Sequence, residues 1–426
     1  MIQQIEPDRM PQTHPQSQKP TTHWPTVLQF SFSVLAIGGL LFFGLLSAAM
    51  GFLEVFSYST SLNASLPLFL TAAGTLASAI LILPSAILSL RRILGRSAAT
   101  YPRGPAWFQP GLLILLFPVV VLLGYLVINQ TELAWLILPF LHVLAVIIPV
   151  FWLLYMILRG LPLGSPQRSW GVFNSGLVLG PIIVMIIELI AAVVIGILGM
   201  FYISSQPGLI DEITALFQDM TTIPSDPEAM IEALAPYLTS PVVILAIFLF
   251  VSVIVPLIEE AVKPIGVWLL IGRRLSAVEG FTAGILSGAG FALFENLAMT
   301  STGVDWALPV ISRIGTAIMH IFTAGLMGWA LVNARREKRY LQLGMTYLLA
   351  IFIHGFWNAL SILLAVEPLY KEFGLGSVNP VISTLGQVAP FILVLLTLIA
   401  FIIMIRLNWQ FRRQLIEAPQ PSNPAV

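Results

Sequence analysis

Long apolar runs separated by short polar segments make up most of the chain. A helix needs about 20 mostly apolar residues to cross the roughly 30 Å hydrocarbon layer, because each residue adds ~1.5 Å. Ten runs meet this requirement, and the fifth and sixth are long enough that we expect them to tilt, break or extend past the bilayer. The predicted spans lie near 27–52, 66–90, 109–128, 134–158, 171–203, 241–272, 279–299, 308–333, 341–366 and 385–406.

Composition indicates an all-α, polytopic membrane protein. Hydrophobic residues make up 58% of the chain and charged residues 9%, against roughly 25% charged residues in soluble domains. The 20 basic and 20 acidic residues cancel, so there is no electrostatic case for nucleic-acid binding. The chain has no cysteine, which excludes disulfides and thiolate chemistry. Any catalysis therefore has to use oxygen and imidazole groups.

The distribution of basic residues predicts how the spans are oriented. Seventeen of the 20 lysine and arginine residues lie in the two tails or in the loops that follow spans 2, 4, 6 and 8. On the opposite side, only one loop carries a basic residue, Lys371. Because basic loops stay in the cytoplasm, we expect both termini to be cytoplasmic, with ten crossings between them.

The polar segments divide the chain into five parts. The first segment is rich in proline and glutamine, which is typical of disorder. The loop 204–240 has six acidic residues and no basic one, and its apolar residues repeat at helical spacing. We expect two amphipathic helices there on the outer leaflet, forming a structural lid or a substrate gate. The parts are a disordered cytoplasmic tail (1–26), an N-terminal five-helix membrane region (27–203), an external acidic amphipathic loop (204–240), a four-helix core (241–366), and a last transmembrane helix with a cytoplasmic tail (367–426).

Ionisable residues within the membrane concentrate in the four spans of the core. Each such group costs about 2.5–3.5 kcal/mol at the bilayer centre, so it is a functional candidate by default. Depth can be counted at ~1.5 Å per residue from the predicted cytoplasmic flank. Four residues, one in each span, lie about 21–24 Å deep by this count: Glu259, Glu295, His320 and His354. We therefore expect one polar layer nearer the external face. Its members are Glu259, Glu260, Lys263, Glu295, His320, His354 and Asn358.

Local spacing predicts how these residues are used. Glu259 and Lys263 are four residues apart and share a helix face, so Lys263 is expected to balance the charge of that carboxylate. Glu260 lies about 100° around the helix and is expected to serve elsewhere. His354 and Asn358 are also four apart and share a face.

Small residues and prolines shape the same spans. Gly280, Gly284 and Gly288 recur every four residues, a pattern that lets membrane helices approach closely. That approach would bring span 7 and Glu295 toward the neighbouring helices. Pro256 and Pro264 bracket the glutamate pair and are expected to kink span 6.

Two kinds of chemistry fit this predicted catalytic core. A carboxylate–histidine set can activate water, while His354 with Asn358 can donate hydrogen bonds to a developing oxyanion. Alternatively, two histidines and a glutamate can bind Zn²⁺ with an open position for water, with Glu295, His320 and His354 as the predicted ligands. Either arrangement hydrolyses an amide.

The same residues resemble a known family. Glu259-Glu260-x-x-Lys263, Phe291-x-x-x-Glu295, His320 and His354-x-x-x-Asn358, on four successive spans, resemble the PrsW family of intramembrane proteases. That family is related to the wider CAAX-protease and bacteriocin-processing superfamily, in which an arginine and a histidine stand in place of Lys263 and Glu295. The resemblance covers about 241–366.

The resemblance implies peptide-bond hydrolysis in a membrane-protein substrate, such as a single-pass signalling protein. It places Glu259, Glu260, Glu295, His320 and His354 in the site, and it implies a protein of a bacterial plasma membrane. Whether water is activated by a metal or by glutamate alone stays open at this point.

Other readings of the same residues remain. A proton- or cation-coupled transporter would use the same carboxylates, and it predicts polar groups at several depths. A non-catalytic scaffold predicts polar groups that satisfy one another. Outside the core, we interpret His142 as a hydrogen-bonded interior residue. In span 8, Arg313 could neutralise the site or hold an external loop, and its position near the outer boundary favours the structural role. Glu188 is a candidate for a further site member or a proton path.

Overall fold

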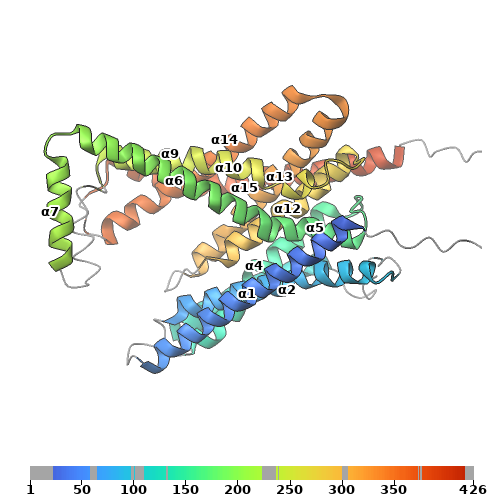
Figure 1. The fold of residues 1–426 in the computed structure, drawn as a ribbon, viewed down its shortest axis with the longest axis horizontal. Helices are drawn as coiled ribbons and strands as arrows, with labels where there is room; N and C mark the ends of the chain where they lie inside the picture. The colour runs from blue at the N-terminus through green and yellow to red at the C-terminus, as the bar shows by residue number, and fades with distance from the viewer. Residues whose placement is uncertain are drawn as a thin grey trace, which may run out of the picture.

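A computed structural model describes residues 23–57, 65–96, 100, 110–130, 133–222, 237, 239–299, 306–372, 374 and 377–417. All regular structure in these residues is helical (Figure 1). Ten helical segments among them are long and apolar enough to cross a membrane, and they coincide with the ten predicted spans to within a few residues at most ends. The protein is therefore an all-α polytopic membrane protein.

Most of the spans are nearly continuous helices, whereas spans 5 and 6 each consist of several elements. In chain order the elements are α1 (Trp24–Ser57), α2 (Leu66–Ile93), η2 (Pro110–Leu115), α3 (Leu116–Gln130), α4 (Ala134–Leu158), α5 (Pro166–Asn174), η3 (Ser175–Leu179), α6 (Gly180–Ser205), α7 (Leu209–Thr222), α9 (Pro241–Leu249), η4 (Phe250–Ile254), α10 (Val255–Val262), α11 (Ile265–Trp268), α12 (Ala277–Leu297), α13 (Ala307–Glu337), α14 (Tyr340–Glu372) and α15 (Pro380–Glu417).

Of the three outcomes expected for the long spans 5 and 6, a break is present in each, as a π-helical turn. In each span the turn, η3 or η4, immediately precedes a helix with proline in its first positions, Pro181 in α6 and Pro256 in α10. Proline has no N–H to donate to the carbonyl four residues earlier, so the preceding turn cannot keep the regular α-helical pattern. Span 6 breaks again after α10, where Lys263 and Pro264 separate α10 from α11.

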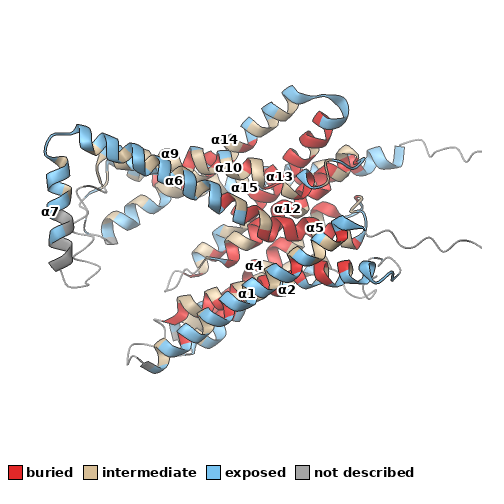
Figure 2. Ribbon diagram, in the orientation of Figure 1, coloured by how far each residue is buried: buried red, intermediate tan, exposed pale blue. Residues whose placement is uncertain are grey.

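The centre of the molecule is the α12–α13 pair. Buried residues run along most of both helices, whereas α1, α6 and α9 are largely exposed (Figure 2). A Cβ on Gly284 would clash with the Ala324 carbonyl oxygen, and one on Gly288 would lie 2.7 Å from the His320 carbonyl oxygen. The predicted small-residue stripe therefore brings the two backbones into contact, and it does so beside His320.

The outer helices carry the apolar surface that a bilayer covers. Large side chains such as Phe42 on α1 and Phe201 on α6 are more than half exposed, as expected where lipid replaces water. Helix α6 leads away from the buried centre to α7, which lies across its far end (Figure 1). Helix α7 is the first of the two predicted amphipathic helices. The second, predicted near Asp226, lies outside the described residues, as does most of the predicted tail.

Candidate active site

Lys263 is the fully buried cation of the site. It follows α10, and its Nζ lies 2.7 Å from Glu260 Oε1 and 3.0 Å from Glu259 Oε2. The predicted pairing with Glu259 is present, but the expectation that Glu260 serves elsewhere is wrong. Residues three and four positions apart are both neighbours on a helix, and the long lysine side chain at the helix end contacts both carboxylates.

Glu260 also contacts a histidine from α14. Its Oε1 lies 2.9 Å from His354 Nδ1, and the other ring nitrogen, Nε2, lies 3.8 Å from Glu259 Oε2. Close approach of the backbones makes this possible, because a Cβ on the neighbouring Gly355 would clash with the Ser252 carbonyl oxygen of η4. The π-helical turn and the glycine together therefore place His354 against the glutamate pair.

A second histidine is backed by a carboxylate in the same way. His320 Nε2 on α13 lies 2.6 Å from Glu295 Oε2 on α12, although the two atoms are not aligned as a hydrogen bond. The other Glu295 oxygen, Oε1, accepts a hydrogen bond from Arg313 Nη1 at 2.7 Å. Arg313, interpreted from the sequence as a structural residue, thus neutralises a site carboxylate. The sequence feature that could have indicated this role is the position of Arg313 two turns before His320 on the same helix.

Three of these residues are arranged as a candidate metal centre. Ligand atoms of Glu259, His320 and His354 all lie within 4.8 Å of one another. The sequence-based ligand set contained Glu295 instead of Glu259. In the structure Glu295 is outside this group and lies beside His320 and Arg313. The difference arises because the packing of α10 against α14 turns Glu259 toward His354, which spacing along one chain cannot indicate.

The donor set fits zinc. Carboxylate oxygen and imidazole nitrogen are common zinc ligands, and catalytic zinc sites use three protein ligands with one open position. In this site Glu259 Oε2 and both ring nitrogens of His320 are buried without a hydrogen-bond partner among the described residues. Ligating histidines commonly contact a carboxylate through the second ring nitrogen, as Glu260 does for His354.

Asn358 makes a hydrogen bond outside the cluster. Its Nδ2 donates to the Val251 carbonyl oxygen of η4 at 2.9 Å, so this donor joins α14 to the π-helical turn. The side-chain amide carries two N–H groups, and this contact engages one of them. The oxyanion-binding role of Asn358 therefore stays a prediction.

Two candidates outside the core differ in their surroundings. His142 is buried and accepts a hydrogen bond from Trp306 Nε1 at 3.4 Å, which confirms it as an interior residue. Glu188 lies on α6, which packs against α10, and it is within electrostatic reach of Glu259, Glu295 and Lys263. One Glu188 oxygen is buried without a partner among the described residues. Glu188 therefore borders the site.

Comparison with known proteins assigns the chain to a family. The model of the PrsW family, described as intramembrane metalloproteases, matches residues 170–403, which is more than half of the chain. The match begins in α5 and ends in α15, so it extends beyond the predicted limits of 241–366 on both sides. No curated protein and no solved structure matched. Together with the glutamates and histidines gathered by α10, α12, α13 and α14, the match shows that the chain belongs to the PrsW family of intramembrane proteases.

Proposed function

We propose that this intramembrane protease cleaves a single-pass membrane protein, such as a signalling protein, within the layer formed by α10, α12, α13 and α14. One observation carries the proposal. Glu259, His320 and His354 come from three different helices, yet their ligand atoms lie within 4.8 Å of one another in a largely buried site. Placing ionisable groups in the membrane is energetically unfavourable, so their presence indicates a function.

In the metal-dependent form of the mechanism, Glu259, His320 and His354 would hold Zn²⁺. The ion would supply Lewis-acid polarisation of the scissile carbonyl and would lower the pKa of a water molecule. Glu260 and Glu295 each lie against one of the histidines, and Lys263 and Arg313 balance their charges. These outer partners orient the imidazole rings, a role whose loss typically reduces activity or metal affinity 10- to 100-fold.

Glu295 is the proposed proton carrier. Its side chain is 35% exposed, the most open of the site carboxylates; Arg313 holds Oε1, while Oε2 is buried 2.6 Å from His320 Nε2. Oε2, which makes no aligned hydrogen bond, would accept a proton from water as the water oxygen bonds to the scissile carbonyl carbon. The same proton would then pass to the amide nitrogen as the C–N bond breaks. General acid–base catalysis of this kind typically contributes 10²- to 10⁴-fold.

The two alternative functions, a scaffold and a transporter, agree less well with these contacts. A scaffold kept for packing would satisfy its own polar groups, whereas His320 Nδ1 is buried with neither an ion pair nor a hydrogen bond among the described residues. A transporter would need polar groups at several depths, whereas Glu188 is within electrostatic reach of Glu259, Glu295 and Lys263. Membership in a protease family favours hydrolysis further.

A cell-based screen tests the proposal. Tagged single-span proteins are expressed with the wild-type chain or with His320→Ala, and cleavage is read from the fragment sizes. We expect His320→Ala to abolish cleavage, while His142→Ala, a matched buried histidine outside the site, retains it at equal expression. Normal cleavage by His320→Ala would refute the assignment.

Metal content separates the two forms of water activation. The purified wild-type protein is expected to contain about one zinc per chain, and Glu259→Gln and His354→Ala are expected to contain much less. Full cleavage by wild-type protein stripped with a membrane-permeant chelator would instead favour glutamate activation alone.

A further inference from the structure

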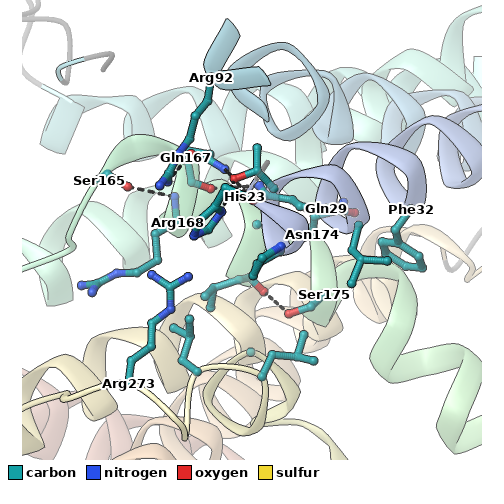
Figure 3. A pocket seen from close by; sticks show the side chains of 18 of the residues that line it. His23, Gln29, Phe32, Arg92, Ser165, Gln167, Arg168, Asn174, Ser175 and Arg273 are labelled. Carbon is teal, nitrogen blue, oxygen red and sulfur yellow. Dashed lines mark hydrogen bonds between the residues drawn. The ribbon is translucent and has the colours of Figure 1, made fainter. Parts of the chain in front are cut away.

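A large cavity lies apart from the candidate active site, near the start of α1. It measures about 610 Å³ and lies among α1, the end of α2, α5 and the segment around α11 (Figure 3). Helix α1 packs along α2, and hydrogen bonds join it to α5, as in the donation from Asn174 Nδ2 to Ser33 Oγ at 3.0 Å. The volume is that of a small-molecule site.

The mouth of the cavity is positively charged. Arg92, Arg168, Arg273 and His23 line it, and no acidic residue of the described part of the chain does. Arg168 is paired with Glu279 at 2.9 Å, and Arg92 Nη1 donates to Gln167 Oε1 at 3.1 Å. Within the part of the chain that the structure describes, the Arg273 guanidinium has neither an ion pair nor a hydrogen bond. Two of the three arginines therefore lack an anionic partner.

The direction in which the pKa of His23 is shifted agrees with a positive potential at this place. Burial, followed by the charges of Arg92 and Arg273, lowers the pKa of His23 below its ordinary value. Figure 3 shows Arg92, Arg168, Arg273 and His23 gathered around the same opening. A group that carries negative charge would relieve this concentration of like charges.

Six uncharged polar residues also line the cavity, and a further part of its wall is apolar and continues onto the lipid-facing surface. Leu28, Phe32, Leu269 and Leu270 line it. Leu28 is 66% exposed and Leu269 is 62% exposed, so both lie at the edge where acyl chains surround the protein. A charged mouth beside an apolar wall matches a molecule with an anionic head and a hydrocarbon tail.

We propose that this cavity binds one anionic glycerophospholipid, with its phosphate between Arg92 and Arg273 and an acyl chain against Leu28 and Leu269. Arginine is suited to phosphate because its planar donors match the phosphate oxygens. Basic pockets between membrane helices on the cytoplasmic side are known lipid-headgroup sites. The basic-residue distribution predicts this face to be the cytoplasmic one. The bilayer itself supplies the ligand.

The position of the cavity gives the lipid a structural role. Gly266 lines the cavity, and its N–H donates to Ser287 Oγ at 3.2 Å, while Ser287 Oγ donates to the Lys263 carbonyl oxygen at 2.6 Å. A lipid in the cavity would therefore brace the segment that follows Lys263 against α5. Its binding does not depend on the proposed catalytic chemistry, so the two proposals can fail separately.

Lipid retention tests the proposal on the full chain. The protein is reconstituted in phosphatidylcholine with graded phosphatidylglycerol, and native mass spectrometry counts the phospholipids that each chain retains. We expect one phosphatidylglycerol to be retained in preference to phosphatidylcholine. Each arginine near a lipid headgroup contributes about fivefold, so Arg273→Gln should weaken retention about fivefold and the Arg92→Gln/Arg273→Gln pair about 25-fold.

Adjacent arginines provide the matched control. The Arg91→Gln/Arg274→Gln pair removes the same charge from exposed positions that do not line the cavity, and it should leave retention within about twofold. Equal losses in both pairs would overturn the proposal in favour of general surface attraction. Equal retention of the two lipids would overturn it directly. Full displacement by soluble glycerol 3-phosphate at the same concentration would overturn it in favour of a site for soluble anions. Circular dichroism checks that each variant is folded.

Discussion

Replacing Lys263 by methionine would leave a buried carboxylate without its counter-charge. Lys263 and Glu260 are both fully buried, and their charged atoms are 2.7 Å apart. Removing one partner of such a pair typically costs about 3–5 kcal/mol, because the remaining charge stays buried without compensation. We expect a loss of this size for Lys263→Met. Adding Glu260→Gln should recover about half of it, a coupling of about 2–3 kcal/mol, because Glu259 still lacks the cation.

The assay is equilibrium unfolding of the four proteins of this double-mutant cycle in mixed micelles, followed by circular dichroism. The pair Arg339 and Glu337 is the control, because its side chains are 58% and 49% exposed and exposed pairs contribute at most about 1 kcal/mol. A coupling below about 0.5 kcal/mol for Lys263 and Glu260 would refute the view that Lys263 holds the buried carboxylate in its charged form.

Three further predictions concern the contacts around the site. Gly284→Ala should destabilise the α12–α13 pair by about 1–3 kcal/mol, whereas Gly196→Ala, with open space around it, should not. Unfolding in mixed micelles measures the stability of both variants. Equal stability would contradict the close approach of the two helices. Asn358→Ala should cost about 1–3 kcal/mol in the same measurement, because the Val251 carbonyl loses its donor. Arg313→Gln should slow cleavage about tenfold without changing expression, and unaltered cleavage would show that Glu295 needs no counter-charge.

Spacing arguments succeeded where a single helix decides the outcome. The ten spans follow from apolar length, and the breaks in spans 5 and 6 follow from length and proline. The glycine repeat predicted close helix contact, and Gly288 makes it beside His320. Each of these inferences depends on local periodicity, which the backbone geometry of a helix translates directly into structure.

Spacing arguments failed where a contact depends on how two or more helices pack together. The direction of Glu260 depended on where α10 ends and on the approach of His354 from α14. The choice of Glu259 over Glu295 in the candidate metal group depended on how α10 packs against α14. Arg313 was interpreted as structural from its position near the outer boundary, and only its contact with Glu295 on another helix shows that it balances a site carboxylate.

The amino-acid sequence alone therefore determined the membrane class, the number of spans and the set of polar residues, since each follows from hydropathy and from the high energy of charges in a bilayer. Only the tertiary structure decided which carboxylate faces which histidine. It also decided that four basic residues from separate segments surround a cavity beside α1. The reason is physical: contacts between helices depend on rotation and depth in three dimensions, and a one-dimensional period specifies neither relative to a neighbour.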